Sequence, residues 1–363
     1  MEEPKSQSNM FFILAVIVIA VVGVIWYVQN KGTNNTDNTT KTKDKLVLQL
    51  KWTPQAQFAG YFVAKEKGYF ADENIDVEIK PGGVGINPVD VLVAGDVNVA
   101  VAWTGNVLPA IAKGEDIVNI GQGFQNSGMV LIAKKSSGIL LPKDIKGKKI
   151  GVWPGGNETE PFAFIAKQGL DRDKDVQIIS QGFDMNQFLN DEIQVASAMT
   201  YNELELVYEA GIKPEDLTIF NLQDNGVGML QDGLFVKRDF LDKNQDLLAR
   251  FLRASMKGWD YSIMNQEAAV DLMGLDFTAN DVTARAHQVK SMAAIAKLCV
   301  ADKGTTQGLF YVDPTKMENT LNIAKAYVKE VKEGNAIDVS KIYTNDIWNK
   351  AKVGVTFSNY SKI

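Results

Sequence analysis

Aromatic and amide side chains follow the first predicted strand of the chain. Residues 46–70 read LVLQLKWTPQAQFAGYFVAKEKGYF, and the alternation over 46–51 predicts a strand that ends at Trp52. Pro54 cannot continue a strand because it lacks a backbone N–H, and a helix carrying Phe58 and Tyr61 is predicted to follow. Open α/β sheets bind ligands at the carboxyl ends of their strands. This stretch therefore predicts a binding site, while the alternative interpretation places Trp52 and Phe58 in the core.

The pattern of a strand followed by tryptophan and polar residues recurs. Residues 97–102 read VNVAVA and precede Trp103, and residues 150–152 read IGV and precede Trp153. The glycine-rich stretch 154–160 then opens a predicted helix, whose free N–H groups attract anions or carbonyl oxygens, so it is a candidate ligand clamp. It lacks the Gly-Lys-Ser/Thr ending of a phosphate-binding loop, and a plain tight turn explains the glycines equally well.

Length and composition exclude several functional classes. A chain of 363 residues exceeds what one hydrophobic core usually fills, so two lobes are expected. The formal net charge of −6, without a basic block, argues against binding of nucleic acid. The single cysteine, Cys299, excludes an internal disulfide and a cysteine-rich metal site. The single histidine, His287, argues against a histidine-ligated zinc and fits a structural or surface role in a helix, so no metal site is expected.

The amino-terminal segment predicts a membrane anchor. Residues 10–28 form an uncharged apolar stretch that is long enough to span a bilayer as one helix, after a short cytoplasmic tail over 1–9. The polar stretch 29–45 is predicted to be a disordered linker. A cleaved signal peptide is the alternative, but its apolar region is usually shorter. The soluble sequence that follows is expected on the extracytoplasmic side of the cell membrane.

The rest of the chain predicts an α/β protein. Strands and helices alternate with short connections up to about residue 238, which favours a mostly parallel sheet flanked by helices. Beyond it, four amphipathic helices are predicted by apolar spacing, and we interpret them as packing elements; they cover 246–264, 267–275, 281–298 and 314–333.

Several of these segments together resemble a known family. The similarity is to ABC-transporter solute-binding proteins of the thiamine-pyrimidine-synthase-like branch, also called SsuA/THI5-like or NMT1. It extends over about residues 46–350. The residues that carry it are 51–61 (KWTPQAQFAGY), 64–70 (AKEKGYF), 150–153 (IGVW), 182–185 (GFDM) and 198–203 (AMTYNE).

The resemblance implies a two-lobed, periplasmic-binding-protein-like (type II) fold with a hinge and a central cleft. One lobe is expected to contain residues 46–127 and 239–363, and the other residues 128–238. Ligand binding in the cleft would close the hinge, and the closed form would be recognised by an ABC permease with its ATPase subunits. The resemblance implies a monomer that transports its ligand and carries no cofactor.

The resemblance also implies a small heteroaromatic ligand. Residues 55–61 look most like those of the riboflavin-binding components, which makes riboflavin the expected ligand. The alternative is a pyrimidine precursor of thiamine biosynthesis, such as hydroxymethylpyrimidine or formylaminopyrimidine.

A flat heteroaromatic ring needs aromatic faces to stack on, and amides or carboxylates that bind its edge. The aromatic candidates for the walls of the site are Trp52, Phe58, Tyr61, Trp103 and Trp153. The polar candidates for the edge are Gln57, Asn106, Gln125, Asn157, Glu158, Tyr201, Asn202 and Glu203. An alternative role for Glu158 and Glu203 is capping or solvation of the helices that begin there.

Catalysis is the competing class of function. The related yeast synthase consumes its own active-site histidine and binds pyridoxal phosphate on a lysine, whereas this chain has only His287 and lacks the cysteine cluster of that enzyme. A nucleophile–base set cannot be assembled from one distant histidine. Binding without catalytic residues is therefore expected. A receptor ectodomain would need a signalling partner, because only about nine residues precede the predicted anchor.

Overall fold

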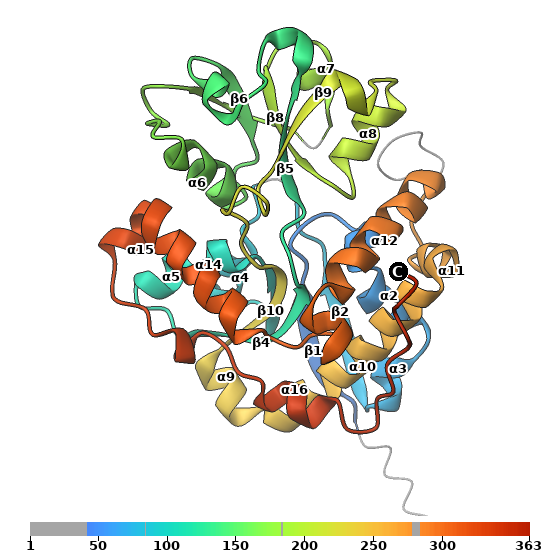
Figure 1. Ribbon diagram of the computed structural model, residues 1–363. Coiled ribbons are helices and arrows are strands. Elements are labelled where there is room, and N and C mark those ends of the chain that lie inside the picture. The colour runs from blue at the N-terminus through green and yellow to red at the C-terminus, as the bar shows by residue number, and fades with distance from the viewer. Residues whose placement is uncertain (1–41, 84, 183, 278–283) are drawn as a thin grey trace, which may run out of the picture. The chain divides into compact units, whose positions relative to one another are not determined.

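The computed structural model describes residues 42–363 except 84, 183 and 278–283 (Figure 1). The predicted anchor over 10–28 and the predicted linker up to residue 41 lie outside the described residues. Within the described part of the chain, the helices are too short or too polar to cross a membrane. The predicted linker ends earlier than expected, because Asp44 and Lys45 already pair with Ile75 and Asp76 in a parallel ladder.

The first sheet has five strands in the order β2-β1-β3-β10-β4. β1, β2 and β3 are parallel, and β10 is antiparallel to both of its neighbours. This sheet is therefore mixed: β1, β2, β3 and β4 run in one direction, as expected for a mostly parallel sheet, and β10 runs against them. The strand bounds are β1 Asp44–Gln49, β2 Ile75–Lys80, β3 Val99–Ala102, β4 Ile117–Phe124 and β10 Gln231–Lys237.

The second sheet repeats this plan in the order β7-β6-β8-β5-β9. β6 is parallel to β7 and β8, whereas β5 is antiparallel to β8 and β9. The strand bounds are β5 Met129–Lys134, β6 Lys149–Val152, β7 Gln177–Ser180, β8 Val195–Met199 and β9 Leu217–Asn221.

The chain crosses between the sheets at residues 125–128 and 222–230. We had placed 128–238 in one lobe, but β10 is a central strand of the first sheet, so the second crossing comes before it. The apolar run of β10 fits either core, and its sequence alone does not say which sheet it joins.

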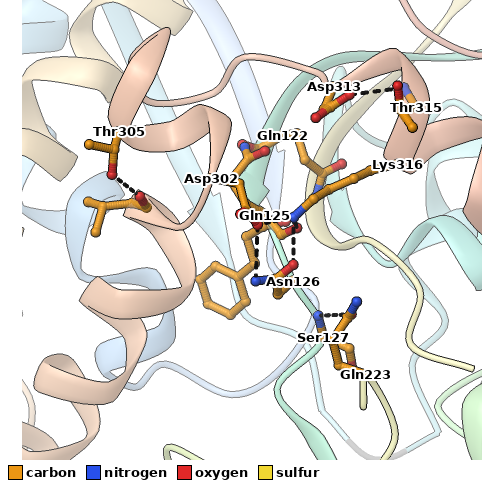
Figure 2. Close-up of polar contacts among 12 residues, drawn as sticks. Gln122, Gln125, Asn126, Ser127, Gln223, Asp302, Thr305, Asp313, Thr315 and Lys316 are labelled. Atoms are coloured by element: carbon orange, nitrogen blue, oxygen red, sulfur yellow. Dashed lines mark hydrogen bonds and ion pairs between the residues drawn. The ribbon is translucent and has the colours of Figure 1, made fainter. Parts of the chain in front are cut away.

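Lys316 fixes the first crossing in place. Figure 2 shows its ammonium donating to the Gln125 carbonyl oxygen at 2.6 Å and to Asn126 Oδ1 at 2.6 Å. The same ammonium pairs with Asp302 Oδ2 at 2.5 Å. Three segments that are distant in sequence therefore meet at the point where the chain leaves the first sheet.

Helices cover both sheets (Figure 1). Those around the second sheet are α6 Thr159–Lys167, α7 Asn186–Leu189 and α8 Glu203–Glu209. Those near the first sheet are α2 Ala59–Glu66, α3 Tyr69–Asp72, α4 Pro88–Ala94, α5 Thr104–Ala112, α9 Arg238–Lys243, α10 Gln245–Met264, α11 Gln266–Leu272, α12 Arg285–Val300, α13 Lys303–Thr306, α14 Pro314–Tyr327, α15 Lys329–Glu333 and α16 Asp346–Ala351. Short 3-10 turns are η1 Ala56–Phe58, η2 Lys135–Ser137, η3 Pro142–Ile145, η4 Pro214–Asp216 and η5 Val339–Lys341.

Close packing of α10 on α2 positions the turn after β1. A Cβ at Gly258 would lie 2.1 Å from the Gly60 carbonyl oxygen, and one at Gly60 would lie 2.2 Å from the Trp259 ring. Only glycine allows the two helices to approach this closely. The contact holds the start of α2, and with it η1, against the end of β1.

Candidate ligand-binding site

A small cavity lies between the carboxyl ends of strands from both sheets. Its volume is about 20 Å³, which is room for about one water molecule and far below the range of about 300–1,000 Å³ for pockets that bind small molecules, so the cavity is nearly closed as it stands. We call it the inner cavity. Its lining consists of Lys51, Trp52, Gln55, Gln57, Trp103, Trp153, Asn157, Met199, Tyr201 and Glu203.

The first sheet presents its lining residues from the ends of β1 and β3. Lys51 and Trp52 follow β1, and the loop after β2 closes over them, with Gly82 N–H donating to the Trp52 carbonyl oxygen at 3.0 Å. A Cβ at Gly82 would lie 2.5 Å from the Leu50 carbonyl oxygen, so this close approach requires glycine. Trp103 follows β3 directly and begins α5.

The second sheet presents its lining residues from the ends of β6 and β8. Trp153 follows β6, and its indole N–H donates to the Gly182 carbonyl oxygen at 2.7 Å, which fixes the ring. Glu203 begins α8 and accepts from Met199 N–H at 2.9 Å and from the Asn202 amide at 2.7 Å. Burial raises the pKa of Glu203 to about 7. The Glu203 carboxylate thus binds the end of β8 and the Asn202 side chain, and it also lies in the cavity wall.

Tryptophans from the two sheets face each other across the inner cavity. The ring centroids of Trp52 and Trp153 are 6.4 Å apart, with an interplanar angle of 57°. Rings in contact have carbon atoms about 3.5–4.0 Å apart, so a third ring does not fit between these indoles as they stand. A ligand that stacks on both must separate them.

Asp232 organises the polar side of the cavity. Its carboxylate accepts from the Trp103 indole N–H at 2.7 Å and from the Gln57 amide at 2.8 and 3.1 Å. Gln57 Oε1 in turn accepts from the Gln55 amide at 2.8 Å. Burial raises the pKa of Asp232 to about 6. This carboxylate fixes the orientation of two lining residues, and our sequence analysis did not select it.

Lys51 was also missing from the predicted site. It is buried, and its Nζ lies 4.7 Å from the centroid of the Trp103 ring. Burial lowers the pKa of Lys51 to about 7, opposed by the charges of Asp232 and Glu158. The alternation over 46–51 made Lys51 look like an ordinary polar residue of a strand with one solvated face. Its position between the apolar residues Leu50 and Trp52 was the signal that could have identified Lys51 as a buried residue.

The inner cavity brings together many of the predicted site residues. These are Trp52, Gln57, Trp103, Trp153, Asn157, Tyr201 and Glu203. The Tyr201 ring also packs edge-on against Phe124, with centroids 5.8 Å apart. The structure shows that these seven predicted residues line the same cavity. Their part in ligand binding stays a prediction.

Phe58 and Tyr61 lie elsewhere. Both are fully buried, and Tyr61 packs against Trp259 and Phe310, with ring centroids 5.7 and 6.3 Å apart. They sit in the first-sheet core, which is the alternative that we had kept open for Phe58. Phe58 and Tyr61 follow Trp52 within ten residues, and this position in the sequence does not show which face of α2 is covered by α10.

The other predicted polar residues lie around the cavity. Gln125 is buried and donates to the Gln122 and Tyr311 carbonyl oxygens at 3.0 Å each, so it braces the first crossing. The Asn202 side-chain oxygen lies 2.8 Å from His287 Nε2, and His287 Nδ1 lies 3.2 Å from Glu209. His287 thus has the structural role that we expected. Among the described residues, no cluster of acidic, histidine or cysteine side chains could hold a metal ion.

Asn106 and Glu158 line a second, larger space, which we call the outer cavity. It has a volume of about 470 Å³ and lies between α4, α5, α6 and α15, and its wall includes Asn87, Asn106, Gly156, Glu158, Phe162 and Arg172. Because Asn157 lines the inner cavity and its two neighbours line the outer one, the two spaces adjoin at this turn. The Asn106 amide is buried without a hydrogen-bond partner among the described residues.

The turn over 154–158 differs from a free anion clamp. Glu158 Oε2 accepts from Gly156 N–H at 2.9 Å, so the chain's own carboxylate occupies this donor. Gly155 and Gly156 both have φ of 90°, and a Cβ at Gly156 would lie 2.6 Å from the Asn106 amide nitrogen. The glycines therefore serve a close approach of this turn to the first sheet.

Comparison with known proteins places the chain in a family. The model of the NMT1/THI5-like family matches residues 55–269, which is more than half of the chain. The chain belongs to the NMT1/THI5-like family. The match includes the turn after β1, the ends of β3, β6 and β8, and Asp232, so all lining residues except Lys51 and Trp52 fall within it.

Related members of the NMT1/THI5-like family carry different names. The chain is 28% identical over 247 residues to the riboflavin-binding protein RibY of Chloroflexus aurantiacus, covering 65% of this chain and 67% of RibY. It is 23% identical over 244 residues to the formylaminopyrimidine-binding protein of Halalkalibacterium halodurans, covering 66% and 72% of the two chains. It is also 26% identical over 231 residues to a 4-amino-5-hydroxymethyl-2-methylpyrimidine phosphate synthase of Saccharomyces cerevisiae, covering 60% and 67%.

Solved structures share the fold of this NMT1/THI5-like chain. The periplasmic nitrate-binding protein of Synechocystis PCC 6803 superimposes with a TM-score of 0.62, at 15% sequence identity, over 86% of this chain and 89% of that protein. The fold is thus like that of periplasmic binding proteins, in agreement with the two mixed sheets described above.

Proposed function

We propose that this NMT1/THI5-like protein is the solute-binding component of an ABC importer and that it captures riboflavin between its two sheets. The observation that carries the proposal is the pair of indoles, Trp52 and Trp153, which approach each other from the two sheets above a cluster of buried amides and carboxylates. Aromatic faces with a polar edge are what a flat heteroaromatic ring requires.

Ligand entry requires the two sheets to move apart. The crossings at 125–128 and 222–230 are the only links in sequence between the sheets within the described residues, and we propose that they form the hinge of a type II binding protein. Reclosure on the ligand would place Trp52 and Trp153 on its two faces. The permease, with its ATPase subunits, would recognise this ligand-closed form.

Two observations favour riboflavin as the ligand. Sequence identity to the riboflavin-binding relative is 28%, against 23% to the formylaminopyrimidine-binding relative. The outer cavity, which adjoins the inner one at Asn157, gives room for a polyol chain attached to the ring. The unpartnered Asn106 amide offers hydrogen bonds to its hydroxyl groups.

A pyrimidine precursor of thiamine is the second candidate, because the inner cavity is small. The cavity has a volume of only about 20 Å³ as it stands, and a single ring requires less opening of it than three fused rings do. A synthase activity has less support. His287 is held between Asn202 and Glu209, outside the lining of the inner cavity, so it is not placed to react with a bound ligand.

We further propose an extracytoplasmic location. It is supported by the sequence of residues 10–28, which has the length and composition of a single membrane anchor. An anchored binding domain would stay close to its permease without being lost to the medium.

The test is a fluorescence titration of riboflavin with the full-length protein in mild detergent. Stacking on tryptophan quenches flavin emission, so quenching that saturates at low micromolar protein or below is expected, and micelles without protein are the control. Hydroxymethylpyrimidine and formylaminopyrimidine are then added as competitors. Absence of quenching, together with a rise of the melting temperature by either pyrimidine, would transfer the assignment to thiamine precursors.

A further inference from the structure

Lys51 is a buried cation in the wall of the inner cavity. Its side chain is 2% exposed, and its Nζ lies over the Trp103 ring. Within the described part of the chain, this ammonium has no hydrogen-bond partner. A buried ammonium without hydrogen bonds is strongly unfavourable, because nothing replaces the water that solvates it outside the protein. The fold thus maintains an unsatisfied donor at the wall of the inner cavity.

The acidic groups around Lys51 are engaged by other donors. Asp232 on β10, Glu158 before α6 and Glu203 on α8 each accept hydrogen bonds from backbone or side-chain groups other than Lys51. With the Tyr201 phenol, they are the titratable groups that surround this side of the cavity. Their charges favour the ammonium form, but the loss of solvation outweighs them, and the pKa of Lys51 falls to about 7. The N–H groups of the Lys51 ammonium are therefore available to a ligand in the inner cavity.

The chemistry of that partner follows from the surroundings. An ammonium donates hydrogen bonds and accepts none, so the partner must offer an acceptor. Asp232, Glu158 and Glu203 would repel an anion, which leaves a neutral acceptor, such as a carbonyl oxygen, as the fitting partner. Because the neighbouring walls are the faces of Trp52, Trp103 and Trp153, that acceptor belongs on the edge of a flat ring.

We propose that Lys51 donates a hydrogen bond to a carbonyl oxygen on the edge of the bound heteroaromatic ring and thereby selects ligands that carry a carbonyl at that position. This inference rests on the proposed function. The dioxopyrimidine edge of a flavin provides such an oxygen on the ring itself, whereas hydroxymethylpyrimidine has no carbonyl and offers ring nitrogens as its acceptors, and formylaminopyrimidine carries its carbonyl outside the ring. A buried donor that stays unpaired penalises the ligand that lacks the matching acceptor.

The test compares riboflavin binding by the full-length wild type, Lys51→Met and Lys67→Met. Lys67 is the matched control, because its Nζ lies 4.1 Å from the centroid of the Tyr261 ring while the side chain is exposed and far from the cavity lining. Lys51→Met is expected to weaken riboflavin binding by about tenfold to a hundredfold, and Lys67→Met by less than about twofold. Circular dichroism and the melting temperature check the fold, and Lys51→Gln replaces Lys51→Met if the latter does not fold.

A calorimetric readout separates hydrogen bonding from packing. A bond to the charged form raises the pKa of Lys51, so the wild type is expected to take up protons when riboflavin binds at pH 8, measured from binding enthalpies in buffers of different ionisation enthalpy. Lys51→Met is expected to take up clearly fewer. Equal affinity and equal proton uptake in wild type and Lys51→Met would overturn the role of Lys51 and leave the proposed function standing. Failure of the wild type to bind riboflavin would instead contradict the proposed function.

Discussion

Two buried ionisable side chains in this molecule have opposite surroundings. Glu160, on α6, accepts from Ser127 Oγ at 2.6 Å and from the Gln231 amide at 2.9 Å, at the two points where the chain passes between the sheets. Lys51 is equally buried but has no hydrogen-bond partner among the described residues and lines a cavity. This difference in hydrogen-bond partners distinguishes a structural side chain, Glu160, from a candidate ligand-binding side chain, Lys51. A buried ionisable group whose hydrogen-bond partners are in the chain stabilises the fold, whereas one without partners at a cavity wall is available to a ligand.

The largest loss of stability is expected on replacement of Glu160, whose carboxyl group has hydrogen-bond partners within the chain. Glu160→Ala would leave the Gln231 amide and the Ser127 hydroxyl with fewer partners in a buried region and would lower the free energy of unfolding by about 2–3 kcal/mol. Glu205→Ala is the matched control, because Glu205 also lies in the first turn of a helix but is only half-buried, and its loss should cost less than about 1 kcal/mol. Urea unfolding measures both. Equal losses would contradict the structural role of Glu160.

A second prediction uses pH to distinguish the two side chains. Burial raises the pKa of Glu160 to about 8, from 4.5 when unfolded, so the folded state holds the proton more tightly and the stability of the wild type falls as pH rises through that window. Glu160→Gln does not titrate, and its free energy of unfolding relative to wild type should rise between pH 5 and 8.

Lys51 should show the opposite trend. Its pKa is lowered to about 7, from 10.5 when unfolded, so the unfolded state binds more protons and the stability of the wild type rises as pH increases from about 7 to 10. The free energy of unfolding of Lys51→Met relative to wild type should therefore fall over that window. Melting curves at steps of one pH unit measure the stability of Glu160→Gln and of Lys51→Met relative to the wild type. If both variants show the same pH dependence, the predicted opposite pKa shifts of Glu160 and Lys51 are wrong.

The smallest effect is expected at the first crossing. Lys316→Ala removes the contacts with Gln125, Asn126 and Asp302, which are partly exposed, and should cost about 1 kcal/mol or less. If this segment is part of the hinge, Lys316→Ala should change the rate of riboflavin association more than the control Lys297→Ala does, since Lys297 is an exposed residue of α12. Stopped-flow flavin fluorescence measures that rate, and identical rates would remove Lys316 from the hinge.

The sequence predicted most strands and the strand ends that meet at the inner cavity, because alternation and turn residues are local signals. Trp52, Trp103 and Trp153 could be selected since each directly follows an apolar strand. The sheet to which β10 belongs was not predictable, because its pairing with β3 and β4 joins residues that are more than a hundred positions apart.

The same limit applies to single side chains. Tyr61 and Trp52 look alike as aromatics near a strand end, and only the approach of α10 at Gly60 and Gly258 decides that Tyr61 is core. Lys51 and Asp232 became candidates only through burial and through their hydrogen bonds or lack of them, which depend on tertiary structure. Periodicity predicts faces of helices and strands, and it does not predict which face another element covers.

The most direct test of the account is a riboflavin titration of Trp52→Ala beside the wild type and Tyr69→Ala. Tyr69 is a half-buried aromatic residue on α3, outside the inner cavity. Loss of one stacking face is expected to weaken riboflavin binding by about tenfold, or about 1.4 kcal/mol, while the melting temperature stays within a few degrees of wild type and Tyr69→Ala binds normally. Wild-type affinity in a folded Trp52→Ala protein would show that riboflavin does not bind between the two sheets at this tryptophan pair.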